Sequence, residues 1–489
     1  MGRMLWAFLA VGVLSGKTYF VDSLDGNDTA DGLAESRAWK TLERVNAAEF
    51  NAGDRVLFRA GSVFHGQLKV RWPITVDKYG DGNLPVIAAD GKFHEALLIE
   101  NQDNVEVSNL ELTNTGASRE TFRYGVRVRA WDYGVMHNIR LKNLFVHDVN
   151  GSLVKKDRGE GHGIVWENGG QRVKSRFDGL LIESCRLART DRNGICGFVP
   201  YPSADRTNRS TNVVIRGNLL EDIGGDGIKV WGCKGALVEH NVLRGARQRC
   251  DDYAAGIWPW ASDDTVIQFN EVSGLKGTKD GEAFDSDAHT TNSIFQYNYS
   301  HDNDGGFLLV CCSNNNGTVV RYNISQNDHT RLFHMADGNN NVAIYNNVFY
   351  IGKNDDVQLF LWSGHDQEWT HGARIVNNIF YVAGKSRNTE GKRNLGDGTY
   401  VGAPGFGGST DIVFEKNVLF GNVADVPEGW RALVMDPQLR APGTGVDGYR
   451  LLPGSPLRGA GIIVNDNGGR DYWGHTIPQP PSIGADSGN

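Results

Sequence analysis

A short pattern recurs through the middle of the chain and constrains its fold more than any other feature. Each copy has a few β-forming residues, a polar pair, an Asn, and then an apolar or β-branched residue, as in VVIRGNLLEDI ending at Ile223 and TVIQFNEVSGL ending at Leu275. The Asn residues follow one another mostly 23 to 31 residues apart: Asn218, Asn241, Asn270, Asn298, Asn323, Asn347, Asn378 and Asn417. A repeat of this length indicates a solenoid.

The repeats predict strands rather than helices, because they lack the 3.6-residue periodicity of an amphipathic helix. Two or three short strands in each repeat fit one coil of a parallel β-helix. The chain must bend between two strands of a coil, and we expect the Asn to adopt the left-handed conformation there. Its amide can also bond to the same Asn one coil away, which predicts an Asn ladder at about 4.8 Å per step.

The sequence predicts an all-β, single-domain, right-handed parallel β-helix with a cap at each end. Tyr19 to Phe58 is typical of a strand, a polar loop, a short amphipathic helix around Thr41 to Ala48, and a second strand. The stretch from Asp436 onward is irregular and is expected to close the other end. We therefore expect an export signal over residues 1–16, an N-terminal cap over 17–60, the β-helix over 61–425 and a closing segment over 426–489.

These two ends, with the repeats between them, resemble the secreted β-helix proteins of the pectate-lyase-like superfamily. The resemblance covers nearly the whole chain and implies the fold. It implies a carbohydrate ligand, but it leaves the reaction open, because the superfamily includes polysaccharide lyases, glycoside hydrolases, epimerases and carbohydrate-binding modules.

The beginning of the chain and its charge bear on location and partners. Arg3 precedes a nearly continuous apolar run, Leu5 to Leu14, and small residues follow at Ser15 and Gly16, a pattern typical of an export signal. No stretch is long enough to span a bilayer. The net charge of −8 argues against a nucleic-acid partner. We expect a secreted or periplasmic monomer, with no membrane partner, that binds a polysaccharide or oligosaccharide.

Six cysteines are present, and their spacing matches no zinc site: Cys185, Cys196, Cys233, Cys250, Cys311 and Cys312. Export would permit disulfides, and Cys233 with Cys250 is the most plausible pair. The alternative is that the cysteines are small buried residues of a stacked core, which we favour for Cys185.

A second motif lies opposite the Asn in each coil, as in DGIKVW at Asp226, AGIWPW at Ala255, EAFDSD at Glu282 and GGFLLV at Gly305. Aligning the copies on the Ile or Phe and applying the strand period of two gives the outward side chains. One outward row reads Lys229, Trp258, Asp285, Leu308 and His334, and the next reads Trp231, Trp260, Asp287 and Val310.

This arrangement predicts a solvent-exposed carbohydrate cleft. The candidate catalytic residues are Asp285, Asp287, Asp226, Glu282 and Lys229; the candidate substrate-binding residues are Trp231, Trp258, Trp260, His289, His334 and Arg249. Flat apolar faces of sugars stack on indoles, and an exposed aromatic patch marks a binding site. Asp285 and Asp287 stand at i and i+2, so each raises the pKa of the other, as a general acid requires.

The main interpretation is a glycoside hydrolase that uses the Asp285–Asp287 pair and needs no cofactor. One alternative is a polysaccharide lyase, in which Lys229 is the base and Ca²⁺ at Asp285, Asp287 and Glu282 assists. Another alternative is a module that binds glycans without cleaving them. The carboxylates beside the tryptophans favour an enzyme.

Overall fold

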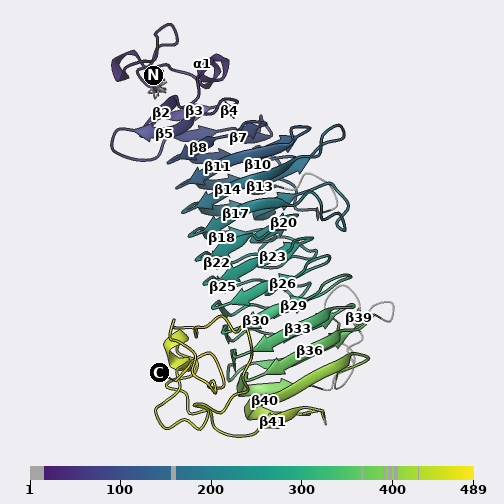
Figure 1. Cartoon of the computed structure of the whole chain (residues 1–489). Coiled ribbons are helices and arrows are strands. Elements are labelled where there is room, and N and C mark those ends of the chain that lie inside the picture. Colours follow the sequence, from purple (N-terminus) through teal and green to yellow (C-terminus); the bar gives the residue numbers. More distant parts are fainter. Residues whose placement is uncertain are drawn as a thin grey trace, which may run out of the picture.

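The computed structural model describes residues 16–155, 161–364, 368–388, 393–394, 399–400, 406–427 and 429–488. The expected export signal therefore lies outside the described residues, except for Gly16. The chain forms one elongated solenoid with the N-terminus at one end (Figure 1). No helix of the described residues is long and apolar enough to cross a bilayer.

Each coil contributes one strand to each of three parallel sheets, here called sheets I, II and III, and each strand pairs in parallel with its counterpart in the next coil. Sheet I contains β4 (Leu68–Val70), β7 (Glu95–Glu100), β10 (Tyr124–Trp131), β13 (His162–Gly169), β16 (Asn193–Phe198), β19 (Ile228–Trp231), β23 (Ile257–Trp260), β26 (Glu282–Ser286), β29 (Gly306–Val310), β32 (Arg331–Ala336) and β35 (Asp356–Ser363).

Sheets II and III complete the coils. Sheet II contains β1 (Thr18–Val21), β2 (Arg55–Arg59), β5 (Thr75–Tyr79), β8 (Val105–Ser108), β11 (Val135–Lys142), β14 (Arg176–Glu183), β17 (Ser210–Arg216), β20 (Cys233–Lys234), β21 (Leu237–Glu239), β24 (Val266–Gln268), β27 (Ile294–Gln296), β30 (Val319–Arg321), β33 (Asn340–Tyr345) and β36 (His371–Val376). Sheet III contains β3 (Val63–His65), β6 (Val86–Ala88), β9 (Glu111–Asn114), β12 (Phe145–Val149), β15 (Arg186–Thr190), β18 (Leu219–Ile223), β22 (Val242–Arg244), β25 (Glu271–Ser273), β28 (Tyr299–His301), β31 (Ile324–Gln326), β34 (Val348–Ile351) and β37 (Ile379–Arg387).

The last coils depart from this regular pattern. The long strand β40 (Thr410–Val423) continues both sheet II and sheet III, and β41 (Arg431–Leu433) pairs with it. A separate antiparallel pair consists of β38 (Arg393–Asn394) and β39 (Thr399–Tyr400).

The predicted Asn ladder runs along the corner between sheets II and III. The amide nitrogen of Asn218 donates to the carbonyl oxygen of the Asn241 side chain at 2.9 Å, and the same bond joins Asn241 to Asn270 at 3.0 Å. The series continues through Asn298, Asn323, Asn347, Asn378 and Asn417. The ladder confirms the stacking, because buried amides need partners for both donor and acceptor.

The prediction that the ladder Asn itself bends the chain is wrong. The preceding residue takes the left-handed conformation instead, for example His240, Phe269 and Tyr297, with φ of 54°, 54° and 57°. Each ladder Asn needs its side chain directed inward to reach the next coil, so the turn falls on its neighbour, whose side chain points outward.

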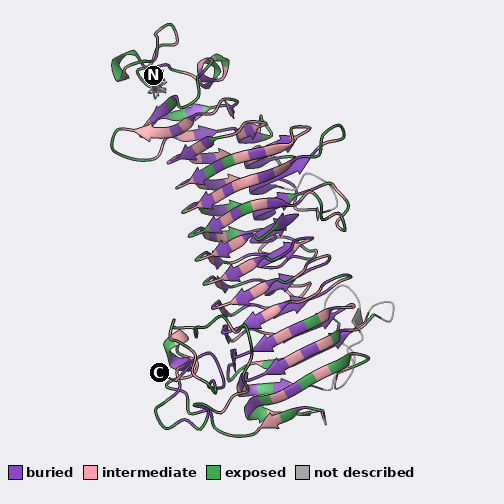
Figure 2. Cartoon of the chain, in the orientation of Figure 1, coloured by how far each residue is buried: buried purple, intermediate pink, exposed green. Residues whose placement is uncertain are grey.

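One continuous apolar core fills the solenoid, with Val, Ile, Leu and Phe side chains from all three sheets. Buried residues recur in the strands from one end of the solenoid to the other (Figure 2). At the N-terminal end, α1 (Leu42–Ala47) buries Leu42 and Val45, and its N-cap Thr41 accepts a hydrogen bond from the Arg44 amide at 3.2 Å. A 3₁₀ turn, η1 (Glu35–Arg37), precedes it. These elements form where the sequence predicts a cap helix.

The C-terminal stretch is irregular, as expected, apart from the 3₁₀ turn η3 (Val446–Tyr449). Trp430 covers the final coil, stacking on Phe414 with ring centroids 4.4 Å apart. The chain then runs back along the outside of the lower coils (Figure 1), where Tyr472 packs with Tyr297 and Tyr322. The segment therefore covers part of one side of the solenoid as well as its end.

Candidate active site

The central strands of sheet I bring the predicted aromatic and acidic side chains together on the outer face. Lys229 pairs with Trp258, and Trp231 pairs with Trp260, between β19 and β23. Ile257 pairs with Phe284 in β26, so Asp285 follows Trp258 in the next coil. The two rows therefore lie side by side, as the alternation of the strands predicts.

The predicted rows contain one register error. Asp285 pairs with Leu309, and Ser286 pairs with Val310, so Cys311 follows Asp287. Leu308 and Val310, which we expected in the outer rows, lie in the core. The reason is that Phe307 fills the core position that Ala283 occupies one coil earlier. An alignment on aromatic residues therefore shifts β29 by one position.

The expectation that these side chains are open to solvent is wrong for most of them. Asp285 and Trp258 are 2% exposed, Asp287 and Lys229 are 8% exposed, and only Trp231 and Trp260 of the aromatic set are half-buried. Segments outside the repeat fold over the sheet. Lys155 reaches the Trp258 ring at 5.8 Å, and the Trp260 indole nitrogen donates to Ser203 at 3.1 Å.

The Lys229 ammonium lies inside a cage of indoles. It stands 4.4 Å from the ring centroid of Trp231, 4.7 Å from that of Trp258 and 5.7 Å from that of Trp260. Aromatic faces attract a cation, so the three indole rings hold the Lys229 side chain in place. The predicted role of Lys229 as a base in a lyase stays a prediction.

Asp226 is fully buried and holds neighbouring groups of the site by hydrogen bonds. One of its carboxylate oxygens accepts hydrogen bonds from the Ala255 amide at 3.0 Å and the Trp258 indole at 3.1 Å. Burial opposes its ionisation, but Lys155, Arg192 and Lys229 outweigh that effect and lower its pKa. This buried carboxylate positions Trp258, and the predicted catalytic role of Asp226 stays a prediction.

Glu282 is also committed to a structural contact. Its carboxylate accepts from the Nε of Arg331 at 2.7 Å, and both side chains are almost fully buried, with 0% and 2% exposure. Removing one member of such a pair leaves a buried charge, so this contact holds β26 and β32 in place. Burial raises the pKa of Glu282 to about 7, and its predicted catalytic role stays a prediction.

Three carboxyl groups remain around the covered face, and all have raised pKa values. Burial, reinforced by Asp287, Asp280 and Glu282, raises the pKa of Asp285 well above its ordinary value. Burial and the charge of Asp280 raise the pKa of Asp287 to about 7. Burial, and then Asp226, raises the pKa of Asp280. Such pKa values allow a carboxylic acid to hold a proton near neutral pH.

Asp280 is the most exposed of these three acids. It is half-buried, with a left-handed φ of 56°, and the following Gly281 has a φ of 73°. An isolated β-bridge to Ala254 holds it beside sheet I, and Arg331 donates to its backbone oxygen at 3.2 Å. Sparsely populated backbone conformations that the surroundings enforce often occur at functional sites.

The remaining predicted binding residues lie in different places. His289 is half-buried two residues beyond Asp287, with its amide donating to the Ser313 carbonyl at 3.0 Å. His334 is 2% exposed and shares a hydrogen bond with Ser363 at 2.8 Å, and burial lowers its pKa well below the ordinary value. His289 is thus placed near the acids, whereas His334 is a buried residue farther along the row.

Arg249 is engaged by another part of the coil. It donates to the backbone oxygens of Thr190 at 2.8 Å and Asp222 at 2.7 Å, and it pairs with Asp191 at 3.1 Å. These contacts join the turns between sheets III and I, and the predicted role of Arg249 in substrate binding stays a prediction.

Two groups near the acids, Lys155 and Asp280, were not among the candidate catalytic or substrate-binding residues predicted from the sequence. Both lie in irregular segments between strands, so the repeat gives them no predictable position. Burial opposes the charged form of Lys155, but Asp226 outweighs that effect and, with Asp280 and Asp287, raises its pKa. The only sequence signals at Lys155 and Asp280 are the low Pro content of the two loops and their acidic or basic residues.

The cysteines differ from the predicted pairing. A disulfide joins the adjacent residues Cys311 and Cys312, and Cys233 and Cys250 are free and buried. Cys185 is buried, as predicted, and Cys196 is also buried. The Cys233–Cys250 pair does not form because Cys233 lies within sheet II, whereas Cys250 lies in the loop that leads to β23.

The oxygens of Asp285, Asp287 and Glu282 do not form a common metal site. Over the described ranges, the groups whose ligand atoms lie within 4.8 Å of one another are Asp287 with Cys311 and Cys312, and Asp471 with His475 and Asp486. The calcium site considered from the sequence would need all three acids to converge. Glu282 is instead held by Arg331, so the geometry does not bring them together.

Comparisons with known proteins bear on both fold and chemistry. A family model described as a right-handed β-helix region matches residues 94–272 and 162–349, which together make up more than half of the chain. A lacto-N-biosidase of Bifidobacterium longum subsp. longum is 28% identical over 96% of this chain, and the chain spans 36% of that protein's length.

Solved structures agree with this family. The crystal structure of a GH136 lacto-N-biosidase from Eubacterium ramulus is 27% identical, with a TM-score of 0.62, over 75% of this chain and 68% of that chain. A PL6 alginate lyase in complex with a trisaccharide is 12% identical, with a TM-score of 0.55, over 88% of this chain and 90% of that chain, and shares the fold alone. The predicted fold class is therefore confirmed, and this chain belongs to the right-handed β-helix family.

Proposed function

We propose that this chain is a glycoside hydrolase that cleaves a lacto-N-bioside-type linkage in an oligosaccharide, with Asp280 and Asp287 as the reacting carboxyl groups. The observation that carries the proposal is the group of acids with raised pKa values beside tryptophans on the outer face of sheet I. Two relatives, 28% and 27% identical to this chain, are both lacto-N-biosidases. This supports the hydrolase predicted from the sequence.

Hydrolysis of a glycosidic bond requires one carboxyl group that donates a proton and another that is ionised. Asp287 and Asp280 suit this pair, because the charge of Asp280 raises the pKa of Asp287 and Asp280 is the most exposed of the three acids. Asp285, which the sequence pairs with Asp287, lies deeper, and its Oδ1 has no hydrogen-bond partner. The raised pKa of Asp285 favours its neutral form, so we assign it no proton transfer in the reaction.

The aromatic residues would bind the sugar. Trp231 and Trp260 have ring centroids 6.1 Å apart, and the exposed Phe198 stands edge-on to Trp231 at 5.3 Å. Trp260 stands one coil before Asp287 in the same outward row, and Trp231 stands two coils before it. A sugar stacked there would place its neighbouring linkage close to the acids, since one coil advances about 4.8 Å.

The test is the hydrolysis of a chromogenic lacto-N-bioside by the wild-type protein and by Asp280→Asn, Asp285→Asn and Asp287→Asn. We expect the changes at 280 and 287 to reduce turnover by at least about 10²-fold, and the change at 285 to cost less. The reverse ranking of Asp280→Asn and Asp285→Asn would return the role to the Asp285–Asp287 pair. Full activity in all three variants would refute the proposal.

Two controls distinguish the alternatives. A lyase would produce an unsaturated uronate from an acidic polysaccharide, with loss of activity in EDTA and recovery with Ca²⁺. For the hydrolase we expect new reducing ends without that product, and no effect of EDTA. A module that only binds glycans would bind the lacto-N-bioside and release nothing.

A further inference from the structure

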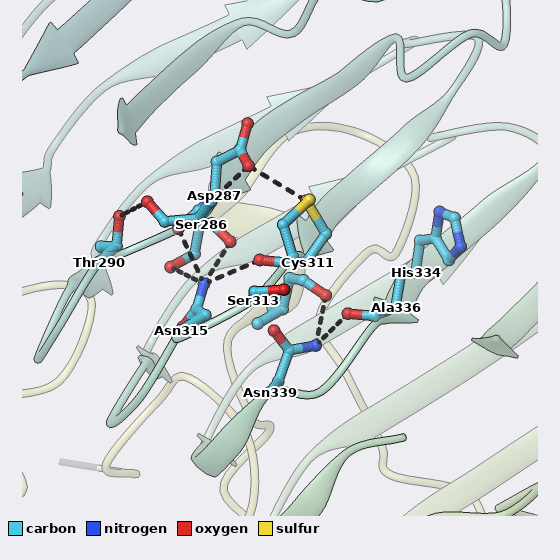
Figure 3. Close-up of a disulfide and its surroundings, with 12 residues drawn as sticks. Ser286, Asp287, Thr290, Cys311, Ser313, Asn315, His334, Ala336 and Asn339 are labelled. Carbon is cyan, nitrogen blue, oxygen red and sulfur yellow. Dashed lines mark hydrogen bonds between the residues drawn. A yellow bond between two sulfur atoms is a disulfide. The ribbon is translucent and has the colours of Figure 1, made fainter. Parts of the chain in front are cut away.

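The Cys311–Cys312 disulfide lies beside Asp287, at the centre of the proposed active site. Cys311 follows Asp287 in the outward row, and its amide donates to the Ser286 carbonyl at 3.0 Å. One sulfur stands 3.4 Å from the Asp287 carboxylate, as the close-up shows (Figure 3). Cys311 is 5% exposed, whereas Cys312 is half-buried, so the second residue of the pair is the one that reaches the surface.

A disulfide between adjacent residues closes a small covalent ring and removes the rotamers of both side chains. Its backbone is fixed as well. The amide of Asn315 donates to the Asp287 carbonyl at 3.3 Å and the Cys311 carbonyl at 3.4 Å, and the Asn339 amide donates to the Val310 carbonyl at 2.7 Å (Figure 3). Binding against such a surface costs no side-chain ordering.

The surroundings of the disulfide are apolar. Leu309, Cys311 and Ala336 form a small cluster on the outer face, with Cys312 packed against it. This cluster is separate from the main core, so its purpose is not to hold the coils together. Sulfur is polarisable and packs well against apolar groups. The patch continues the row directly beyond the acid.

Asp287 therefore lies between two apolar surfaces of the same row. Trp260 precedes it by one coil, and the disulfide follows it by one coil. Strands two coils apart are separated by about 10 Å, which leaves room for one sugar ring. Ligand pockets typically have apolar walls with a few polar groups at the reacting point.

We propose that the Cys311–Cys312 disulfide is a wall of the sugar-binding subsite at Asp287, against which the apolar C–H face of the sugar at the scissile bond packs. The inference rests on the proposed function, because that function supplies the sugar. The disulfide then determines substrate affinity and specificity, while the carboxyl groups perform the reaction.

The kinetic test uses the double variant Cys311→Ala/Cys312→Ala, because a single change would leave a reactive thiol. With the chromogenic lacto-N-bioside we expect KM to rise roughly 10-fold, since a buried apolar contact of a few carbon-sized atoms is lost, and kcat to change less. Cys185→Ala removes a buried free thiol at a distant corner and should leave KM unchanged. An unchanged KM in the double variant would overturn the inference.

Reduction provides an independent test on the native sequence. A phosphine reductant should raise the KM of the wild-type protein and have no effect on the double variant, and reoxidation should restore the wild-type value. Alkylation of the denatured, unreduced protein should label the four free cysteines, and all six after reduction. Labelling of six before reduction would contradict the proposal, as would stoichiometric zinc in the purified protein, because Asp287 and two thiolates could bind that metal.

Failure of the function and failure of the wall are distinguishable. Calorimetry on the wild-type protein could show binding of the lacto-N-bioside without cleavage, and about 10-fold weaker binding by the double variant. This result would support the disulfide as part of the sugar-binding subsite and refute the proposed hydrolase activity. If the wild-type protein cleaves the substrate and the double variant matches it, only the wall is refuted. If the wild-type protein neither binds nor cleaves, both fall.

Discussion

The N-terminal and central coils carry charged residues in the same outward rows of sheet I, but they arrange them in opposite ways. In the N-terminal coils, Arg127 pairs with Glu95 at 2.8 Å and Glu167 at 2.7 Å, and Arg129 pairs with Glu100 at 2.7 Å. In the central coils, Asp280, Asp285 and Asp287 gather with few direct partners, and burial raises their pKa values.

This difference indicates which acids are structural and which are available for chemistry. A carboxylate held by arginines on both sides is satisfied and fixes neighbouring coils together. A buried carboxyl group without a matched cation costs free energy, and such groups persist mainly where function needs them. Position in the repeat alone does not separate the two cases, since Glu100, Glu167 and Asp287 belong to one row.

The strongest test of this contrast is activity. Asp287→Asn should reduce kcat/KM for a lacto-N-bioside by at least about 10²-fold, because it removes a reacting carboxyl group. Glu167→Gln, in the same row, should leave kcat/KM within a factor of about two, since Glu167 is a structural residue. A loss of comparable size in both variants would show that the two regions do not differ as argued.

The free energy of unfolding should depend more on the charged residues of the N-terminal coils. Arg127→Met leaves Glu95 and Glu167 without their shared cation, so we expect a loss of about 1–3 kcal/mol in the free energy of unfolding, measured by denaturant titration. The control Arg172→Met removes an arginine whose side chain is 86% exposed, and it should cost at most about 0.5 kcal/mol. Equal losses in the two variants would contradict the structural role of Arg127.

The repeat made the solenoid predictable, because one Asn in each coil has the same physical task and the apolar residues around it have a fixed spacing. The alternation of side chains along a strand predicted that Trp258 and Asp285 point away from the core. It could not predict that both are buried, because the segments that cover them, with Lys155 and Ser203, lie outside the repeat. Phe307 shows a further limit, since a core position at a corner accepts either an aromatic ring or the methyl group of Ala283.

The disulfide and the ion pair between distant coils could not be predicted from the sequence, for another reason. Adjacent cysteines rarely bond, so Cys311 and Cys312 gave no sign of a disulfide. The Glu282–Arg331 contact joins residues two coils apart, and no local sequence pattern indicates it.

Export and a monomeric state stay predictions.

Neutralising Asp285, the most buried of the three acids Asp280, Asp285 and Asp287, should stabilise the central coils. The folded-state pKa of Asp285 is raised, so its favourable contribution exists below its ordinary pKa and is lost as the pH rises through the folded-state value. Asp285→Asn removes that penalty, and at about pH 8 we expect a gain on the order of 1 kcal/mol in the free energy of unfolding. The gain should shrink toward about pH 5, where the wild-type carboxyl group is protonated. A constant difference across this range would show that ionisation of Asp285 is not the cause.

The smallest expected effect concerns Lys155, the cation that lies over the central coils. Its charge lowers the pKa values of Asp280, Asp285 and Asp287, partly offsetting the burial that raises them. Lys155→Met removes this charge, so all three pKa values should rise and both limbs of the pH profile of kcat/KM should move to higher pH. Lys276→Met, which removes an exposed lysine, should leave the profile in place. A shift of only one limb would mean that a single carboxyl group senses Lys155, and a shift to lower pH would contradict the balance of charges proposed for this face.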